Sequence, residues 1–336
     1  MGAAELRTES ASRLDEALPA TLAVRVAALT VLAPDILGVE LRAAGHGALP
    51  PFTAGAHIDV HLPNGVSRSY SLVNSPRETH RYEIAVKRET GGRGGSAFVH
   101  DILRLDDVLA IGSPRNNFVL DEEAPYSVLF AGGIGVTPML AMADRLVALG
   151  RPFELHYGVR SRADAAFLDR LAPYAERPGT VVRVWPDDEL VGRRIDMRAV
   201  AGRTPEHTHF YCCGPAPMIA AFEASLAHLP PTRLHREHFS GAAELGEQGG
   251  FDVVLARSGR VLRVPEGETV LDTLLDAGVR VDFSCMEGFC GSCRTRVIEG
   301  TPVHKDTVLS AAERASGTVM LVCCSTVEGR RLVLDL

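Results

Sequence analysis

Apolar and polar residues alternate along the first hundred residues of the chain. Segments 56–62 (AHIDVHL), 67–73 (SRSYSLV) and 81–89 (RYEIAVKRE) carry this period of two, and turn-forming stretches such as LPNG and TGGRGG lie between or after them. A period of two predicts strands with one buried face. Several short strands at this spacing predict an antiparallel β-barrel or sandwich.

The pattern changes near residue 124. A run of apolar residues ending in glycines, SVLFAGG, predicts a buried strand, and TPMLAMADRLVALG after it has apolar positions at helical spacing. FELHYGV, TVVRVW and THFYCCG predict further strands, and AAFLDRLAPYA and PAPMIAAFEASLAHL predict further helices. Strands that alternate with helices predict a doubly wound parallel sheet.

A glycine-rich stretch without apolar period, GAAELGEQGG, predicts a flexible linker at residues 241–250. After it, FDVVLARSG and RVLRVPEG predict strands, and TVLDTLLDAG predicts a helix that leads into CMEGFCGSC. The chain therefore divides into a flexible leader (1–20), a barrel (21–124), an α/β domain (125–240), the linker and a small C-terminal domain (251–336).

The composition narrows the class of protein. With 46% apolar and 23% charged residues the chain is ordinarily globular, and a net charge of −7 gives no basic footprint for nucleic acid. No run approaches the roughly 18 apolar residues of a membrane span, and the acidic N-terminal segment lacks the apolar core of a signal peptide. We expect a cytoplasmic protein that binds neither nucleic acid nor membrane.

Cys285, Cys290 and Cys293 form a C-x4-C-x2-C pattern, and Cys323 and Cys324 follow later. A disulfide framework, a zinc site and an iron–sulfur cluster are the three alternatives. A reducing cytoplasm disfavours disulfides. Zinc sites usually pair two C-x2-C knuckles, and only one is present here, whereas the spacing is that of plant-type ferredoxins. We therefore predict a [2Fe–2S] cluster.

A glycine turn between a strand and a helix is a candidate nucleotide site. Gly133, Gly135 and Pro138 form G-x-G-x-x-P, in which backbone N–H groups and the helix dipole can face a pyrophosphate. Cys213 and Gly214 end a later strand at the carboxyl edge, where open α/β sheets bind ligands. The alternatives are a turn without ligand and a purely structural role for the cysteine.

The predicted barrel offers groups that suit a phosphate and an aromatic ring system. In RSYSLVNSP, the alternation of a strand places Arg68 and Tyr70 on one face and Ser71 on the other. Arginine binds phosphate through its planar fork, and tyrosine presents a flat face. The GRGGS loop (92–96) lets the backbone approach a phosphate closely.

Seven motifs occur in one order: RSYSLVNSP, AVKRETGGRGGS, PRNNF, AGGIGVTPML, YCCGP, REHF and CMEGFCGSC. Together they resemble the phthalate dioxygenase reductase family, within the ferredoxin–NADP reductase superfamily, from about residue 21 to the end. The resemblance implies FMN in the barrel, a nicotinamide nucleotide in the α/β domain and a plant-type [2Fe–2S] cluster in a C-terminal β-grasp ferredoxin domain.

The resemblance also implies roles for individual residues. Those assigned to FMN are Arg68, Tyr70, Ser71, Lys87, Gly94, Gly95, Ser96 and Phe239. Those assigned to the dinucleotide are Gly133, Gly135, Thr137, Pro138, Cys213 and Gly214. The cluster ligands are Cys285, Cys290, Cys293 and Cys323, with Cys324 as a bystander. Ser71 would hydrogen-bond flavin N5, Cys213 would lie near the nicotinamide, and Phe239 would shield the flavin and move aside for the nicotinamide.

Coenzyme preference stays open at this point. Ser161 stands where NADH-preferring relatives place an aspartate, and Arg160 and Arg162 beside it offer charge for the 2′-phosphate of NADPH. The family resemblance favours NADH. The implied reaction passes hydride to FMN and then single electrons through the cluster to a separate terminal oxygenase of Rieske type (dioxygenase, monooxygenase or O-demethylase). A cytochrome P450 partner, an oxidase and an iron–sulfur redox sensor without turnover are the alternatives.

Overall fold

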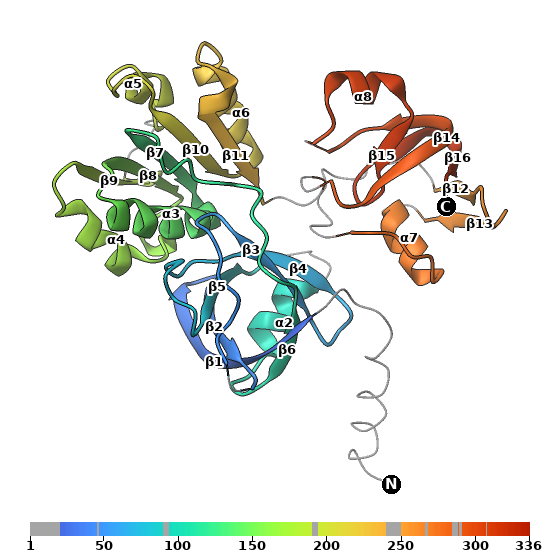
Figure 1. The fold of residues 1–336 in the computed structure, drawn as a ribbon, viewed down its shortest axis with the longest axis horizontal. Coiled ribbons are helices and arrows are strands. Elements are labelled where there is room, and N and C mark those ends of the chain that lie inside the picture. The colour runs from blue at the N-terminus through green and yellow to red at the C-terminus, as the bar shows by residue number, and fades with distance from the viewer. Residues whose placement is uncertain are drawn as a thin grey trace, which may run out of the picture.

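The computed structural model describes residues 21–45, 47–89, 94–189, 194–239, 250–265, 268–283, 288, 291–306 and 308–336. The predicted leader and all but the last residue of the predicted linker lie outside these ranges. Three sheets organise the chain, one after another in sequence (Figure 1). Within the described ranges, no helix is long and apolar enough to cross a membrane.

The first sheet is antiparallel throughout, with the order β4-β3-β6-β1-β2-β5. Its elements are β1 (Leu22–Ala33), β2 (Ile36–Ala43), β3 (His57–His61), β4 (Ser67–Ser71), β5 (Tyr82–Lys87), α2 (Gly95–Asp101) and β6 (Val108–Ile111). The segment after β4 turns back to the opposite edge of the sheet, where the Val73 N–H donates to the Glu83 carbonyl in β5 at 2.8 Å. The predicted antiparallel barrel is therefore confirmed.

The second sheet is parallel, with the order β11-β10-β7-β8-β9. Its strands are β7 (Ser127–Gly132), β8 (Phe153–Val159), β9 (Thr180–Pro186), β10 (His209–Gly214) and β11 (Leu234–His238). Its helices are η1 (Gly133–Gly135), α3 (Val136–Leu149), η2 (Arg162–Asp164), α4 (Leu168–Ala175), α5 (Met197–Ala201), α6 (Ala216–Leu226) and η3 (Pro231–Arg233).

Residues of β7 alternate between two hydrophobic cores, as a strand covered on both faces requires. Leu129 and Ala131 pack in the core that contains α3, whereas Val128 and Phe130 pack in the core that contains α6. The doubly wound arrangement predicted from the sequence is therefore confirmed.

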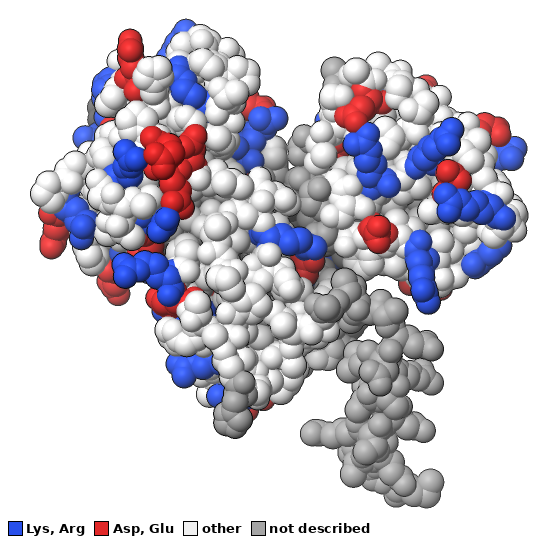
Figure 2. Space-filling view, in the orientation of Figure 1, with Lys and Arg blue, Asp and Glu red and all other residues white. Residues whose placement is uncertain are grey.

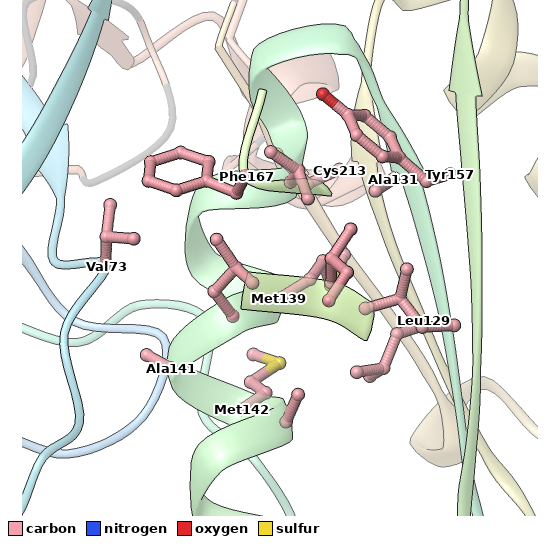
Figure 3. Close-up of a cluster of buried hydrophobic side chains, with 14 of the residues drawn as sticks. Val73, Leu129, Ala131, Met139, Ala141, Met142, Tyr157, Phe167 and Cys213 are labelled. Atoms are coloured by element: carbon pink, nitrogen blue, oxygen red, sulfur yellow. The ribbon is translucent and has the colours of Figure 1, made fainter. Parts of the chain in front are cut away.

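The barrel and the parallel-sheet domain share one core. Val73 of the barrel lies opposite Phe167 and α3 in this core (Figure 3). Arg170, on α4, donates to the Val73 carbonyl at 2.7 Å, to Glu83 of β5 at 3.1 Å and to Asp144 of α3 at 2.8 Å. Because a half-buried guanidinium and apolar packing both cross the boundary, the two domains hold each other in one arrangement.

The third sheet is mixed, with the order β13-β12-β16-β14-β15 and a parallel pair, β12 and β16. Its elements are β12 (Phe251–Leu255), β13 (Val261–Val264), α7 (Val270–Asp276), β14 (Arg294–Val303), α8 (Ala311–Ser316), β15 (Val319–Leu321) and β16 (Thr326–Leu334). This domain has its own core and lies beside the other two in Figure 1. Positive and negative side chains are interspersed over the face shown in Figure 2, so the described part of that face carries no continuous basic surface.

Candidate functional site

A cleft of about 1180 Å³ runs between the barrel and the carboxyl edge of the parallel sheet. One wall comes from β4, β5 and the start of α2, and the other comes from the turns after β7 and β10. Most of the residues predicted for the flavin therefore lie in the same cleft as most of those predicted for the nucleotide.

Arg68, Tyr70 and Ser71 all line the barrel wall of this cleft. Simple alternation places Ser71 on the opposite face of β4 from Arg68 and Tyr70. Because β4 is an edge strand and ends at Ser71, the cleft can extend around the end of this strand and contact residues of both faces. The Ser71 hydroxyl is buried and has no hydrogen-bond partner among the described residues. Because buried polar atoms are normally satisfied, this hydroxyl fits a bound ligand that completes the site.

The start of α2 lies directly against the arginine. A Cβ built on Gly95 would lie 3.1 Å from Cγ of Arg68, so a glycine there lets the backbone lie close to that side chain. Gly94, the residue before the helix, has φ of 83°, which favours glycine. Ser96 and Lys87 also line the cleft, and the Ser96 hydroxyl accepts from the Glu89 N–H at 3.0 Å.

The turns after β7 and β10 touch each other at the point where the strand order reverses. A Cβ on Gly135 would lie 2.2 Å from the Cys213 carbonyl oxygen, and one on Gly132 would lie 3.2 Å from Cα of Gly214. Gly133 has φ of 53° and nothing within 4 Å of its position for a Cβ. Gly132 and Gly135 therefore allow the two backbone turns to pack closely, whereas Gly133 leaves space through which a ligand can approach the backbone.

Cys213 itself lies in the shared core. Its side chain is buried among Ala131, Tyr157 and Phe167 rather than lining the cleft, and burial raises the pKa of its thiol well above the usual value (Figure 3). Only the backbone of this residue reaches the turn that contains Gly135.

Of the other residues predicted for this wall, three line the cleft and one is buried away from it. Thr137 lines the cleft, and its hydroxyl donates to the Ile134 carbonyl at 2.9 Å. Gly214 and Phe239 line it too, and Phe239 also packs against the shared core directly after β11. Pro138 is buried in the first turn of α3 and does not line the cleft.

Acidic side chains lie beside Arg160 and Arg162, which follow β8 at the carboxyl edge of the sheet. Arg162 makes two hydrogen bonds to Glu189, at 2.9 and 3.0 Å, and Ser161 donates to Asp164 at 2.8 Å. Arg160 is exposed, lines the cleft, and lies 3.7 Å from Asp164.

Asp187 and Trp185, at the end of β9, also line the cleft, and neither was predicted from the sequence. The rule that ligands bind at the carboxyl ends of parallel strands applies to β9 as well, and this rule would have indicated them.

Two of the four predicted cluster ligands come together at the end of the β14–β15 pair. Arg294 pairs with Leu321, which brings Cys293 before β14 close to Cys323 after β15, and the Val322 N–H donates to the Cys293 carbonyl at 3.3 Å. Both cysteines are buried, at 2% and 1% exposure. Buried cysteines at one edge of a small sheet fit a thiolate-bound cluster.

The loop that carries the predicted ligands needs glycine at two positions. Gly288 and Gly291 have φ of 83° and 77°, and a Cβ on Gly288 would lie 2.6 Å from the Cys324 sulfur. Cys285 and Cys290 lie outside the described residues.

Comparison with known proteins assigns a domain family to each of the three parts of the chain. Three family models match: an oxidoreductase FAD-binding domain over residues 24–120, an oxidoreductase NAD-binding domain over residues 129–224, and a 2Fe-2S iron-sulfur cluster binding domain over residues 253–328. The chain is an NAD(P)H-dependent oxidoreductase that combines a flavin, a nicotinamide nucleotide and a [2Fe–2S] cluster.

Individual relatives specify the family. A phenoxybenzoate dioxygenase subunit beta from Ectopseudomonas oleovorans is 47% identical over 94% of this chain and 98% of its own length. A solved phthalate dioxygenase reductase is 39% identical with a TM-score of 0.82, over 94% of this chain and 98% of that one. The chain belongs to the phthalate dioxygenase reductase family. An intact self-sufficient cytochrome P450 monooxygenase matches 98% of this chain with 44% of its own, at 38% identity and a TM-score of 0.72.

Proposed function

We propose that this protein is an NADH-dependent, FMN-containing reductase that supplies single electrons to a separate terminal oxygenase of Rieske type. The observation that carries the proposal is the single cleft in which the wall of Arg68, Tyr70 and Ser71 faces the turns of Gly133 and Gly214. When bound, the flavin would accept a hydride from the nicotinamide and pass its electrons one at a time to the iron–sulfur cluster.

Ser71 and Phe239 would act where the two walls meet. The buried Ser71 hydroxyl, with no partner among the described residues, would hydrogen-bond the flavin edge at N5. Phe239, half-buried between the cleft and the shared core, would cover the flavin and move aside for the nicotinamide. Cys213 would contribute through its backbone, since its thiol lies in the core.

Ser71→Ala is expected to lower the rate of flavin reduction by NADH about tenfold to a hundredfold, because one positioned donor at a reacting centre is removed. Flavin content is expected to stay near that of the unaltered protein, since the phosphate contacts are untouched. Stopped-flow absorption at saturating NADH measures the rate. Ser67→Ala is the matched control, because Ser67 lies on the same strand, bonds to His61 at 2.7 Å and does not line the cleft. An unchanged rate in Ser71→Ala would remove this residue from the reaction.

The barrel end of the cleft supports FMN as the flavin. There Arg68 lies against Gly95, the first residue of α2, and Ser96 follows. A guanidinium beside the N–H groups of the first turn of a helix suits a terminal phosphate. Chromatography of the flavin released on denaturation is expected to yield FMN, and release of FAD would contradict this assignment.

The acidic surroundings of Arg160 and Arg162 support NADH over NADPH. Arg162 is paired with Glu189, Arg160 lies beside Asp164, and Asp187 adds a further carboxylate, so a 2′-phosphate would meet several acidic groups, with Arg194 as an opposing positive charge in the lining of the cleft. We expect kcat/KM for NADH to exceed that for NADPH at least about tenfold, the size of a modest charge effect. Steady-state reduction of a one-electron acceptor with each nucleotide measures the ratio. An equal or inverted ratio would contradict this preference.

The partner follows from the relatives, which carry the names of dioxygenase subunits and reductases. Oxidation of NADH is expected to be slow alone and to accelerate when a terminal oxygenase and its substrate are added. Rapid oxygen consumption without any partner would instead indicate an oxidase. A cytochrome P450 is the second candidate acceptor, because a self-sufficient P450 monooxygenase matches nearly the whole of this chain.

A further inference from the structure

Three rings form a ladder across neighbouring strands of the parallel sheet. Phe130 on β7 stacks on His156 on β8 with ring centroids 5.5 Å apart, and Trp185 on β9 follows at 6.0 Å. Trp185 is the one tryptophan of the sequence, and it lines the cleft from β9, the edge strand opposite to β11 in the sheet order. The ladder therefore leads from a buried core to a ring at the cleft.

A hydrogen bond fixes the orientation of the Trp185 ring. Its indole N–H donates to Nδ1 of His156 at 3.2 Å. Since an indole N–H can only donate, Nδ1 must accept, and the proton of the neutral imidazole lies on Nε2. Nε2 then donates to Glu154 at 3.0 Å.

Glu154 anchors this chain of hydrogen bonds in the core. Its buried carboxylate accepts two bonds from Arg203, at 2.7 and 2.6 Å, and one from the Tyr126 hydroxyl at 3.1 Å. Burial raises the pKa of Glu154, but the hydrogen bonds from His156 and Arg203 outweigh burial and lower that pKa to about 2. The carboxylate thus stays ionised and holds the imidazole in one orientation.

The surroundings of the ring leave it accessible from the cleft. Trp185 pairs with Gly158, which has no side chain and also lines the cleft. Ile195 and Met197 line the same end. A fixed, half-buried aromatic face beside apolar side chains suits a flat heterocycle.

We infer that Trp185 is the stacking surface for the adenine of the dinucleotide, held in position by His156, Glu154 and Arg203. This inference rests on the proposed function, in which the nicotinamide end of the dinucleotide lies near Ser71 and Phe239. In the sheet order, the glycine turn after β7 lies between β11, which Phe239 follows, and β9, which carries Trp185, so the adenosine half is left to the end where Trp185 lies.

The test compares NADH with reduced nicotinamide mononucleotide, which lacks the adenosine half. Trp185→Ala is expected to raise KM for NADH about tenfold, the size of one lost base–aromatic stack, with kcat nearly unchanged. KM for the mononucleotide is expected to stay as it is in the unaltered protein. An equal rise for both donors would show that the substitution acts through the fold, and no rise with NADH would show that the ring makes no contact. Either result overturns the inference.

Trp185→Phe separates stacking from positioning. Phenylalanine keeps a ring but cannot donate to His156, so a smaller rise in KM for NADH, about twofold to threefold, is expected. A rise as large as that of Trp185→Ala would mean that the ring does not stack. If neither donor reduces the unaltered protein, the proposed function fails, and this outcome is distinct from failure of the adenine assignment alone.

The tryptophan supplies a readout that does not depend on activity. Its emission is expected to change when ADP-ribose is added to the unaltered holoprotein, because ADP-ribose carries the adenine but no reduced nicotinamide. Unchanged emission at saturating ADP-ribose would contradict contact between the base and the ring.

Discussion

Cys323→Ser is expected to abolish electron transfer to one-electron acceptors while NADH still reduces the flavin. Cys323 is buried at the end of the β14–β15 pair beside Cys293, where a serine hydroxyl is a far weaker ligand for iron than a thiolate. The expected loss in cytochrome c reduction is a hundredfold or more, since the path out of the flavin is removed. Iron content and the visible spectrum of the purified variant measure whether the cluster is present.

Cys324→Ala is the matched control at the neighbouring position. The Cys324 sulfur packs against Gly288 and lies 3.8 Å from the Leu321 carbonyl, in the core of this domain. The variant is expected to keep its cluster with a small loss of stability from the deleted thiol. If Cys324→Ala loses the iron and Cys323→Ser keeps it, the assignment of the fourth ligand is reversed.

Gly135→Ala is expected to lower the free energy of unfolding by about 3 kcal/mol and to abolish productive binding of NADH. The added Cβ would lie 2.2 Å from the Cys213 carbonyl oxygen and 2.9 Å from the Gly214 nitrogen, and neither backbone atom can move cheaply. Relief of the clash must separate the turns after β7 and β10, which form the nucleotide wall of the cleft. Thermal unfolding and NADH titration measure the two effects.

Gly133→Ala provides the comparison, since it changes the same turn without a clash. Nothing lies within 4 Å of its Cβ position, but its φ of 53° makes alanine strained by about 1–2 kcal/mol. This variant is expected to fold and to bind NADH more tightly than Gly135→Ala does. Equal behaviour of the two variants would show that close packing of the turns is not the reason for the glycines.

Segments with strong periodicity were predictable from sequence. The alternation at residues 81–89 corresponds to β5, and the helical spacing at 137–150 corresponds to α3, which ends at Leu149 and is followed by Gly150 in the left-handed conformation. The helix α2 was not predicted, because it is short and begins in a glycine-rich loop without an apolar stripe. Its formation depends on packing against the barrel, which local sequence does not encode.

The candidate site was predictable where a motif fixes the conformation of a backbone turn. It was less predictable where tertiary packing decides the direction of a side chain. The residues predicted around Ser71 and Gly133 meet in one cleft because strand ends and strand order bring them there. The direction of the Cys213 side chain could not be deduced, since alternate residues of β10 face opposite cores. The position of Trp185 at the carboxyl end of β9 could have been predicted, but its hydrogen bond to His156, a neighbour on another strand, could not.

The most direct test of the account is an anaerobic titration of the purified protein with NADH, followed by visible absorption. We expect the flavin and iron–sulfur absorbances both to bleach, with about one and a half equivalents of NADH per chain, because FMN accepts two electrons and the cluster accepts one. Bleaching of the flavin alone, in protein that contains no iron, would contradict it.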